Sequence, residues 1–364
     1  METVTAPRLH PLGIGEMLDQ AVRIYRSNFI NFIGIIAIVQ IPISVLNLIL
    51  SLLTASSTAA SLQNPIAPSD NPFEILGPGY LAGMGGSCIL MIVSLLLVQG
   101  AATAALTRAV TDHYLGAQIG IASAYRKISN SWLRLAGAVL LAIICSLGLM
   151  IWLLIPCIGW VTGLGMTFFF LMVIFPLIAP IVVLERQTAF NSIRRAWDLA
   201  RRRFWWVVGF TALLAIFGQI VVSGPATLMN LAIQFLTRDM VMSGDISTGL
   251  IIQTVVQSLV TLIFNLIYTP LQLTCMTLLY FDLRVRTEGF DLTLMAEGAQ
   301  GEQIDISEIV AQAPPPETTS LVTGTEVGYF VLLSIGAAGV VAAMIAFGGG
   351  IGLLMAGGAG MFGP

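Results

Sequence analysis

The fold is decided by the stretch Ala21-Val-Arg-Ile-Tyr-Arg-Ser-Asn-Phe29-Ile-Asn-Phe-Ile-Gly34, in which the aromatic ring stands eight positions after the alanine and the glycine five positions after the ring. The same spacing recurs twice, at Ala124, Trp132 and Gly137 and at Ala196, Phe204 and Gly209. In every copy a short segment with one polar face precedes the aromatic residue, and a long apolar run follows it. This recurrence predicts a triplication in which each repeat comprises an interfacial helix and a transmembrane hairpin.

The composition indicates a membrane protein with several spans. Hydrophobic residues make up 57% of the 364 residues and charged residues 10%, whereas charged residues are about 25% of ordinary soluble domains. The mean hydropathy is +0.91. The net charge of -3 suggests no nucleic-acid partner, because it sums two separated populations of charge rather than one basic face. We therefore expect an all-α, polytopic membrane helix bundle.

The apolar stretches are long enough to cross a bilayer, which takes about 20 helical residues for about 30 Å of hydrocarbon. They predict six spans, at 30–54, 83–107, 133–155, 161–184, 205–236 and 251–281. These spans form a membrane core at 8–296, with repeats at about 12–110, 118–186 and 189–286. An appended C-terminal span is expected at 327–347, within a terminal segment, 325–364, that ends in a Gly-rich tail.

The positions of the basic residues predict the orientation, because basic loops stay cytoplasmic. In the six-span arrangement only Arg238 falls on the outer side, and every other Lys and Arg falls on the inner side. The N-terminus is therefore expected in the cytoplasm of a bacterial cell and the C-terminus outside. The opening segment, METVTAPRLHPLGIGEML, lacks the pattern of a removable signal peptide, so the first span is expected to be its own insertion signal.

The three interfacial helices are expected to lie in the headgroup plane with a basic face toward the cytoplasm. In the third helix we expect an apolar face made of Phe190, Ile193, Trp197, Ala200 and Phe204, opposed by a polar face made of Arg194, Arg195, Asp198, Arg201 and Arg202. These helices either anchor each hairpin or also bind anionic lipid headgroups or a membrane or cytosolic protein partner. The residues that would make such a contact are Arg194, Arg195, Arg201, Arg202, Arg203, Arg23 and Arg26.

The spans carry amides and prolines but no charged residue away from a helix end, which disfavours a proton-coupled pump. The amides form a polar intramembrane stripe of Gln40, Asn47, Gln253, Gln257, Asn265 and Gln272. They are expected to form hydrogen bonds between helices, with a polar pathway as the alternative. Kinks are expected at Pro42, Pro176, Pro180, Pro225 and Pro270, with a break of the fifth span at Ser223-Gly224-Pro225 as a further alternative.

Residues 287–324 differ sharply in composition from the core. They contain seven acidic residues, no basic residue and the run Pro314-Pro315-Pro316, which predicts a flexible acidic linker. The apolar helix that follows, Val327 to Phe347, is expected to be an added anchor or a helix that docks a partner.

No residue set identifies a reaction, a cofactor or a metal. The only histidines, His10 and His113, are far apart in the sequence, and the four cysteines are scattered singly. The single lysine, Lys127, is not part of a phosphate-binding loop, and no Gly-x-Ser-x-Gly sequence occurs. We therefore expect no enzyme activity, no cofactor and no metal site.

Two stretches resemble a known family. They are Pro11 to Phe29, PLGIGEMLDQAVRIYRSNF, and Leu278 to Leu292, LLYFDLRVRTEGFDL. Both are similar to bacterial multi-pass proteins that resemble the membrane domain of glycerophosphoryl diester phosphodiesterases, over residues 8–296. In such enzymes catalysis belongs to a separate soluble barrel, which has no counterpart here. The resemblance therefore implies a membrane module without a catalytic residue.

Two functions from different classes remain in view. The first is a non-catalytic scaffold or accessory subunit that contacts lipid or a partner through the basic interfacial helices. The second is a transporter or permease for a neutral or amphiphilic substrate that uses the amide stripe and the proline breaks. A wet cavity that reaches Gln257 and Asn265 would favour the transporter, and a dry core would favour the scaffold.

Overall fold

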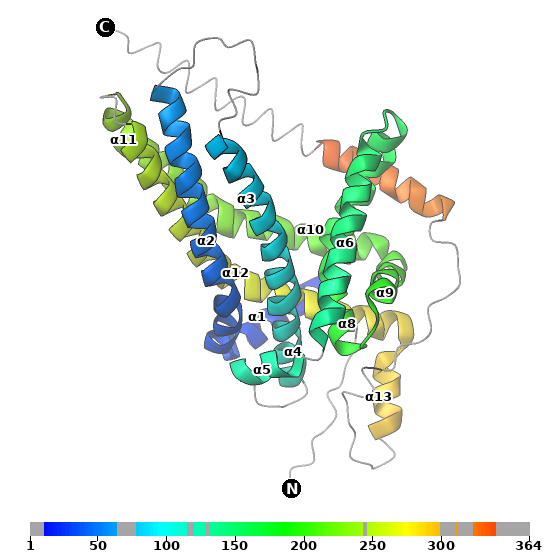
Figure 1. Cartoon of the computed structure of the whole chain (residues 1–364). Helices are drawn as coiled ribbons and strands as arrows, with labels where there is room; N and C mark the ends of the chain where they lie inside the picture. Colours follow the sequence, from blue (N-terminus) through cyan, green and yellow to red (C-terminus); the bar gives the residue numbers. More distant parts are fainter. Residues whose placement is uncertain are drawn as a thin grey trace.

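The computed structural model describes residues 11–63, 78–114, 120–128, 131–242, 246–298, 311 and 323–339. Every secondary-structure element within them is helical. Six helical segments are long and apolar enough to cross a membrane: Phe29–Ala55, Gly85–His113, Trp132–Leu153, Gly159–Leu184, Phe204–Ile233 and Thr248–Glu288. The predicted all-α class is thereby confirmed, and the six helices fit a multi-pass membrane protein (Figure 1).

The repeated aromatic residues mark the start of the first span in each hairpin. These spans begin with α2 (Phe29–Gln63), α6 (Trp132–Leu153) and α10 (Phe204–Gly218). A separate helix precedes each of them: α1 (Ile14–Ser27), α5 (Ile121–Ile128) and α9 (Ala189–Arg201). The alanine that opens each copy is buried, as expected for the inner face of a packed helix. Whether the three units superpose stays a prediction.

The repeated glycine makes room for the next short helix in one of the three copies. A Cβ atom added to Gly34 would lie 2.6 Å from a side-chain carbon of Ile121 on α5, and one added to Gly137 would contact Ala189 on α9. At Gly209 a Cβ atom would have no neighbour within 4 Å. Close helix packing therefore accounts for Gly34, whereas the contact at Gly137 is of ordinary van der Waals length and Gly209 has none.

Three of the spans contain π-helical turns, namely the returning spans of the first two hairpins and the outgoing span of the third. In the first hairpin the chain returns through α3 (Pro78–Ser94), η1 (Leu95–Ala102) and α4 (Thr103–Tyr114). In the second hairpin it returns through η3 (Gly159–Gly163), α7 (Leu164–Phe169), η4 (Phe170–Ile174) and α8 (Phe175–Leu184). The third hairpin continues from α10 through η5 (Gln219–Ser223) and α11 (Gly224–Met242) and returns as α12 (Ile246–Glu288). The fifth span therefore crosses Pro225 with a π-helical turn and without a break.

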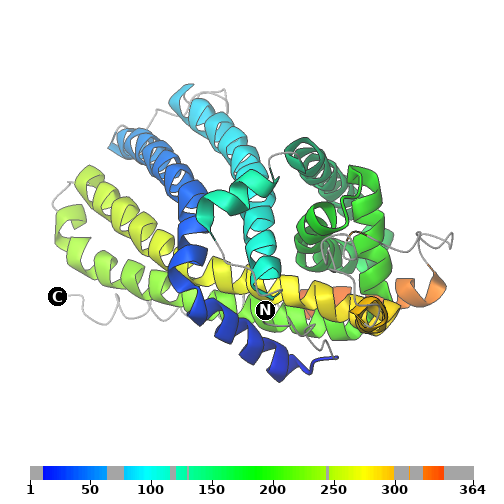
Figure 2. The same cartoon turned by 90° about the horizontal axis from the view of Figure 1, so that it is seen from below.

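The centre of the bundle is formed by the returning spans, because α4, α8 and α12 all contact one another. The buried apolar residues of these three helices form one core with the inner faces of α1, α5 and α9. The short helices α1 and α5 lie at the end of the bundle opposite the hairpin turns (Figure 1). Seen from that end, α1 runs alongside α12, and α2 and α3 stand apart from α6 (Figure 2).

The chain is helical in a region that we predicted to be a linker. Helix α12 ends at Glu288, and α13 (Phe290–Gly298) follows after Gly289, which adopts a left-handed backbone with φ of 64°. The prediction of a linker from residue 287 is therefore wrong for 287–298. The rest of the predicted linker, apart from residues 311, 323 and 324, lies outside the described residues.

A C-terminal helix at 324–339 covers part of the predicted seventh span, whose remaining residues, 340–347, lie outside the described part of the chain. Its buried Phe330 packs edge-on against Phe169 and Phe204, with ring centroids 5.7 and 5.6 Å apart. The backbone N–H of Gly165 donates a hydrogen bond of 2.7 Å to the hydroxyl oxygen of Ser334. This helix therefore docks on the core, at α7 and the start of α10.

Candidate functional site

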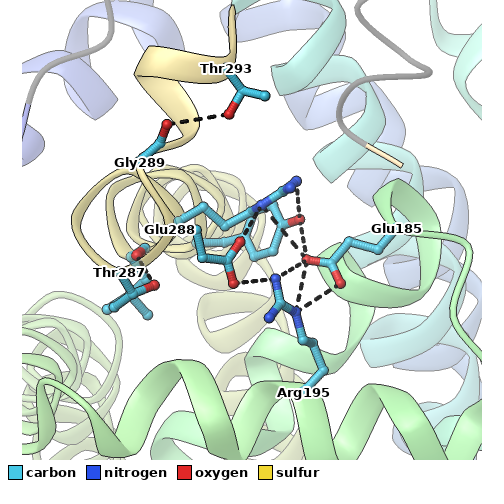
Figure 3. A network of polar contacts seen from close by, with 9 residues as sticks. Glu185, Arg195, Thr287, Glu288, Gly289 and Thr293 are labelled. Atoms are coloured by element: carbon cyan, nitrogen blue, oxygen red, sulfur yellow. Dashed lines mark hydrogen bonds and ion pairs between the residues drawn. The ribbon is translucent and has the colours of Figure 1, made fainter. Parts of the chain in front are cut away.

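A buried network of charged residues joins the end of α8 to α9 and α12. Glu185 follows the last residue of α8, and its side chain is 0% exposed. It forms an ion pair with Arg195 on α9, with an N to O distance of 3.1 Å, and accepts a hydrogen bond of 2.8 Å from the Tyr280 hydroxyl on α12. Glu288 links the two arginines of the network, because it pairs with Arg195 and, at 3.2 Å, with Arg284 (Figure 3).

The network is balanced in charge and rich in hydrogen bonds. Two arginines face two glutamates, and Arg284 also donates a hydrogen bond of 3.2 Å to the Tyr280 oxygen. The Arg284 guanidinium lies 4.3 Å from the centre of the Phe290 ring, an arrangement typical of a cation–π contact. Burial of charges is tolerated when each charge has such partners, and removal of one partner leaves the other charge uncompensated.

A second polar contact fastens the N-terminal segment to the end of α12. The backbone N–H of Leu12 donates a hydrogen bond of 2.9 Å to the Asp282 carboxylate, and Arg286 donates one of 2.6 Å to the Leu12 carbonyl oxygen. Arg286 also pairs with Asp282 at 2.7 Å and stacks over Trp206, 5.1 Å from its ring centre. We call the Leu12, Asp282 and Arg286 contact the terminal clasp. It brings together the two stretches on which the family resemblance rests.

The structure corrects the faces that we predicted for α9. Arg195 and Asp198, expected on the exposed polar face, are buried. The physical reason lies outside the helix, because Glu185 and Glu288 supply counter-charges that make burial of Arg195 favourable. Arg195 is therefore not available to a lipid headgroup or a partner.

The remaining predicted basic residues divide into two groups. Arg23, Arg26, Arg202 and Arg203 are exposed, and Arg194 is partly buried. The side chain of Arg201 is only 11% exposed and lies 3.2 Å from Asp198 and 3.9 Å from Glu326, which belongs to the C-terminal helix. We call the four exposed residues the basic face. It comprises part of α1 and the turn between α9 and α10.

Asp198 sits at the border between α9 and the C-terminal helix. Burial raises the pKa of its carboxyl group above the usual range, although four neighbouring arginines, led by Arg201, oppose this shift. Its Oδ2 atom is buried without a hydrogen-bond partner among the described residues. Asp198 and Arg201 thus belong to the packing of the C-terminal helix rather than to the basic face.

The predicted amide stripe does not act as one unit. Gln253 donates an interhelical hydrogen bond of 2.9 Å to Asn230 on α11, as expected, whereas Asn47 is exposed and bonds within its own helix, to Ile43. The Oε1 atom of Gln257 is buried without a partner in the described structure. The other members, Gln40, Asn265 and Gln272, are partly buried.

A central cavity of about 140 Å³ lies where four spans converge. Its walls come from η1 and α4, from η4 and α8, from α10 and from α12. The polar residues of its lining are Thr103, Thr211, Thr269 and Gln272. Gln257 and Asn265 do not line it, so only one amide of the predicted stripe faces this cavity.

The described ranges show no arrangement of side chains typical of a metal site. Among those residues, no group of three or more His, Cys, Asp and Glu side chains is placed to hold a metal ion. The described cysteines are all free thiols.

Sequence reasoning missed Glu185, Tyr280, Asp282 and Glu288. A signal was present in α12, because Asp282 with Arg286 and Arg284 with Glu288 are each four residues apart, the spacing that pairs side chains on one helix face. Nothing in the local sequence shows that Glu185 and Arg195 join this group. That information depends on how α8, α9 and α12 meet.

Together, the fold and its polar contacts define a multi-pass helical membrane protein that is closed by a terminal clasp and a buried charge network. The chain belongs to the family described as Domain of unknown function (DUF7847), which matches residues 12–283. The match begins at Leu12 and ends one residue after Asp282, so the clasp joins its two ends. No curated protein and no solved structure matches the chain.

Proposed function

We propose that this protein is a non-catalytic membrane scaffold or accessory subunit whose basic face binds anionic lipid headgroups. The observation that carries this proposal is the exposure of Arg23, Arg26, Arg202 and Arg203 on segments that are fixed to the core. The terminal clasp holds the start of α1, and the charge network holds α9. Four arginines are thereby presented in a fixed arrangement.

The physical basis is electrostatic. Each basic side chain near an anionic leaflet contributes about 1 kcal/mol of binding free energy, and the contribution falls off within a Debye length. Because α1 and α9 are already ordered by the core, little conformational entropy is lost when a headgroup binds. Arginine also suits phosphate, since its planar guanidinium can donate two parallel hydrogen bonds.

The test replaces all four residues, as Arg23→Gln, Arg26→Gln, Arg202→Gln and Arg203→Gln. We expect retention of phosphatidylglycerol in mixed micelles, measured by mass spectrometry, to fall at least tenfold, since roughly 4 kcal/mol of favourable electrostatic energy is removed. The matched control replaces the same residues by lysine, which keeps the charge and should keep most of the binding.

Two further measurements make the test decisive. Binding should weaken as salt rises, and a change of Arg238 to glutamine, on the side predicted to be external, should have no effect. If the glutamine variant retains as much phosphatidylglycerol as the unchanged protein, the interfacial helices act only as anchors. Phosphatidylcholine serves as the zwitterionic reference.

The orientation in a bacterial cytoplasmic membrane is also a proposal, supported by the distribution of basic residues. We expect single cysteines at Arg23 and Arg203 to react with a membrane-impermeant thiol reagent only from the cytoplasmic side, and cysteines at Asp70 and Asp245 only from outside. Asp112 and Asp198 are unsuitable positions because both are buried. The four native cysteines must be replaced first. Labelling of Arg203 and Asp70 from the same side would contradict the topology.

The resemblance to the membrane domain of glycerophosphoryl diester phosphodiesterases is part of the proposal, because it too implies a membrane module without a catalytic domain. The second candidate function, a permease for a neutral or amphiphilic substrate, is favoured by one observation, the central cavity beside Gln272. The absence of Gln257 and Asn265 from its lining weakens this candidate, because no polar pathway then links the amide stripe.

A further inference from the structure

The central cavity is large enough to hold a small molecule. Its volume of about 140 Å³ is close to the ~150 Å³ of an engineered cavity that takes up benzene, and a liquid water molecule occupies ~30 Å³. Unlike that engineered cavity, it is lined by hydroxyl and amide groups as well as apolar side chains. A ligand of this size that is wholly apolar would leave the Gln272 amide without a partner.

The polar groups that line the cavity provide a defined set of hydrogen-bond donors and acceptors. The Thr103 hydroxyl donates a hydrogen bond of 3.0 Å to the Val98 carbonyl oxygen, and the Thr211 hydroxyl donates one of 2.9 Å to Val207. Since each threonine proton is used in this way, the oxygen lone pairs are left to accept hydrogen bonds. Gln272 has no hydrogen bond within the described residues, so its amide can both donate and accept.

The cavity favours an uncharged ligand. No charged residue lines it. The buried Arg284, further along α12, already pairs with Glu288 and donates a hydrogen bond to Tyr280. An ion in the cavity would lose its hydration without gaining a counter-charge, which is costly inside a bilayer.

The backbone around the cavity departs from regular α-helix in two of its walls. Val98 belongs to η1, and Leu171 and Met172 belong to η4, both π-helical turns. Pro176 lies in the same wall as η4. Such turns are rare in proteins and are frequently found at functional sites. This backbone irregularity is an observation independent of the polar lining.

We propose that the central cavity is a binding site for a small uncharged polyol of about the size of glycerol. Hydroxyl groups of the polyol donate to the oxygens of Thr103 and Thr211, and the Gln272 amide donates to a hydroxyl oxygen. Binding here is independent of the basic face, so failure of either proposal leaves the other standing.

The test places a single cysteine at Thr269, in the protein with its four native cysteines replaced by alanine. We expect a small neutral methanethiosulfonate to modify this cysteine and saturating glycerol to slow the reaction at least fivefold. Mannitol, a larger polyol, should not protect it at equal osmolality. A second cysteine position, Ala215 on the α10 wall, repeats the measurement if the first variant fails to fold.

Two glutamines on α12 provide a matched pair. Protection by glycerol should be lost in the variant Gln272→Leu and retained in Gln257→Leu, because only Gln272 lines the cavity. The proposal is overturned if the cysteine does not react, if glycerol does not slow the reaction, or if both leucine variants behave alike. Protection by mannitol equal to that by glycerol would also overturn it.

Discussion

Replacing Glu185 by glutamine is expected to lower the free energy of unfolding by about 3–5 kcal/mol. The substitution keeps the size of the side chain and removes its charge, so Arg195 and Arg284 are left with one carboxylate, Glu288, between them. Because both arginines are buried, water cannot compensate the excess positive charge. The change should be measured by unfolding in mixed micelles with sodium dodecyl sulfate.

The matched control is Glu16→Gln. Glu16 is exposed and only accepts a hydrogen bond of 2.9 Å from the Gly13 backbone, so the same chemical change there should cost less than about 1 kcal/mol. In the double variant Glu185→Gln with Arg195→Gln, at least half of the lost stability should return, since Arg284 and Glu288 still pair. A single and a double variant of equal stability would contradict the charge-balance argument.

Replacing Gly165 by leucine is expected to release the C-terminal helix from the core. A Cβ atom at this position would collide with the carbonyl oxygen of Phe330 and lie 2.9 Å from the backbone nitrogen of Ser334. Backbone atoms cannot move aside as a flexible side chain can, so the helix must shift as a whole. We expect amide hydrogen exchange at 324–339 to become more than tenfold faster, as measured by mass spectrometry.

Gly209→Leu serves as the control for this prediction. Gly209 also lies in a membrane span, but a Cβ atom there meets nothing within 4 Å. Exchange at 324–339 should therefore stay slow in that variant. An equal increase in both variants would mean that the docking of the helix does not depend on its close approach to Gly165.

Hydropathy and the repeated spacing were sufficient to predict the spans and the residues at which three of them begin. Phe29, Trp132 and Phe204 are the first residues of α2, α6 and α10. Their surroundings could not be predicted, because Phe29 is 42% exposed whereas Phe204 is buried and stacks on Phe169 at 4.6 Å. Phe204 also packs against Phe330 of the C-terminal helix, a contact that nothing in the repeated spacing indicates.

The residues of the candidate site and of the cavity were harder to predict from the sequence than the spans. Helical periodicity assumes that charged residues face water, and Arg195 breaks this assumption because its partners come from two other helices. Likewise, Gln257 and Gln272 are alike in sequence, and only the packing of α12 against α4, α8 and α10 places Gln272 at the cavity. Local patterns locate helices, but they do not determine how the helices are rotated against one another.

The terminal clasp has a consequence for synthesis of the chain. Leu12 is synthesised 270 positions before its partner Asp282, which lies near the end of the sixth span. During that interval α1 lacks the helix that it packs against, and Tyr25 lacks the Ile267 carbonyl oxygen to which its hydroxyl donates. A chain that stops before α12 therefore exposes the buried face of α1, a feature by which quality-control proteases can distinguish unfinished chains from complete ones.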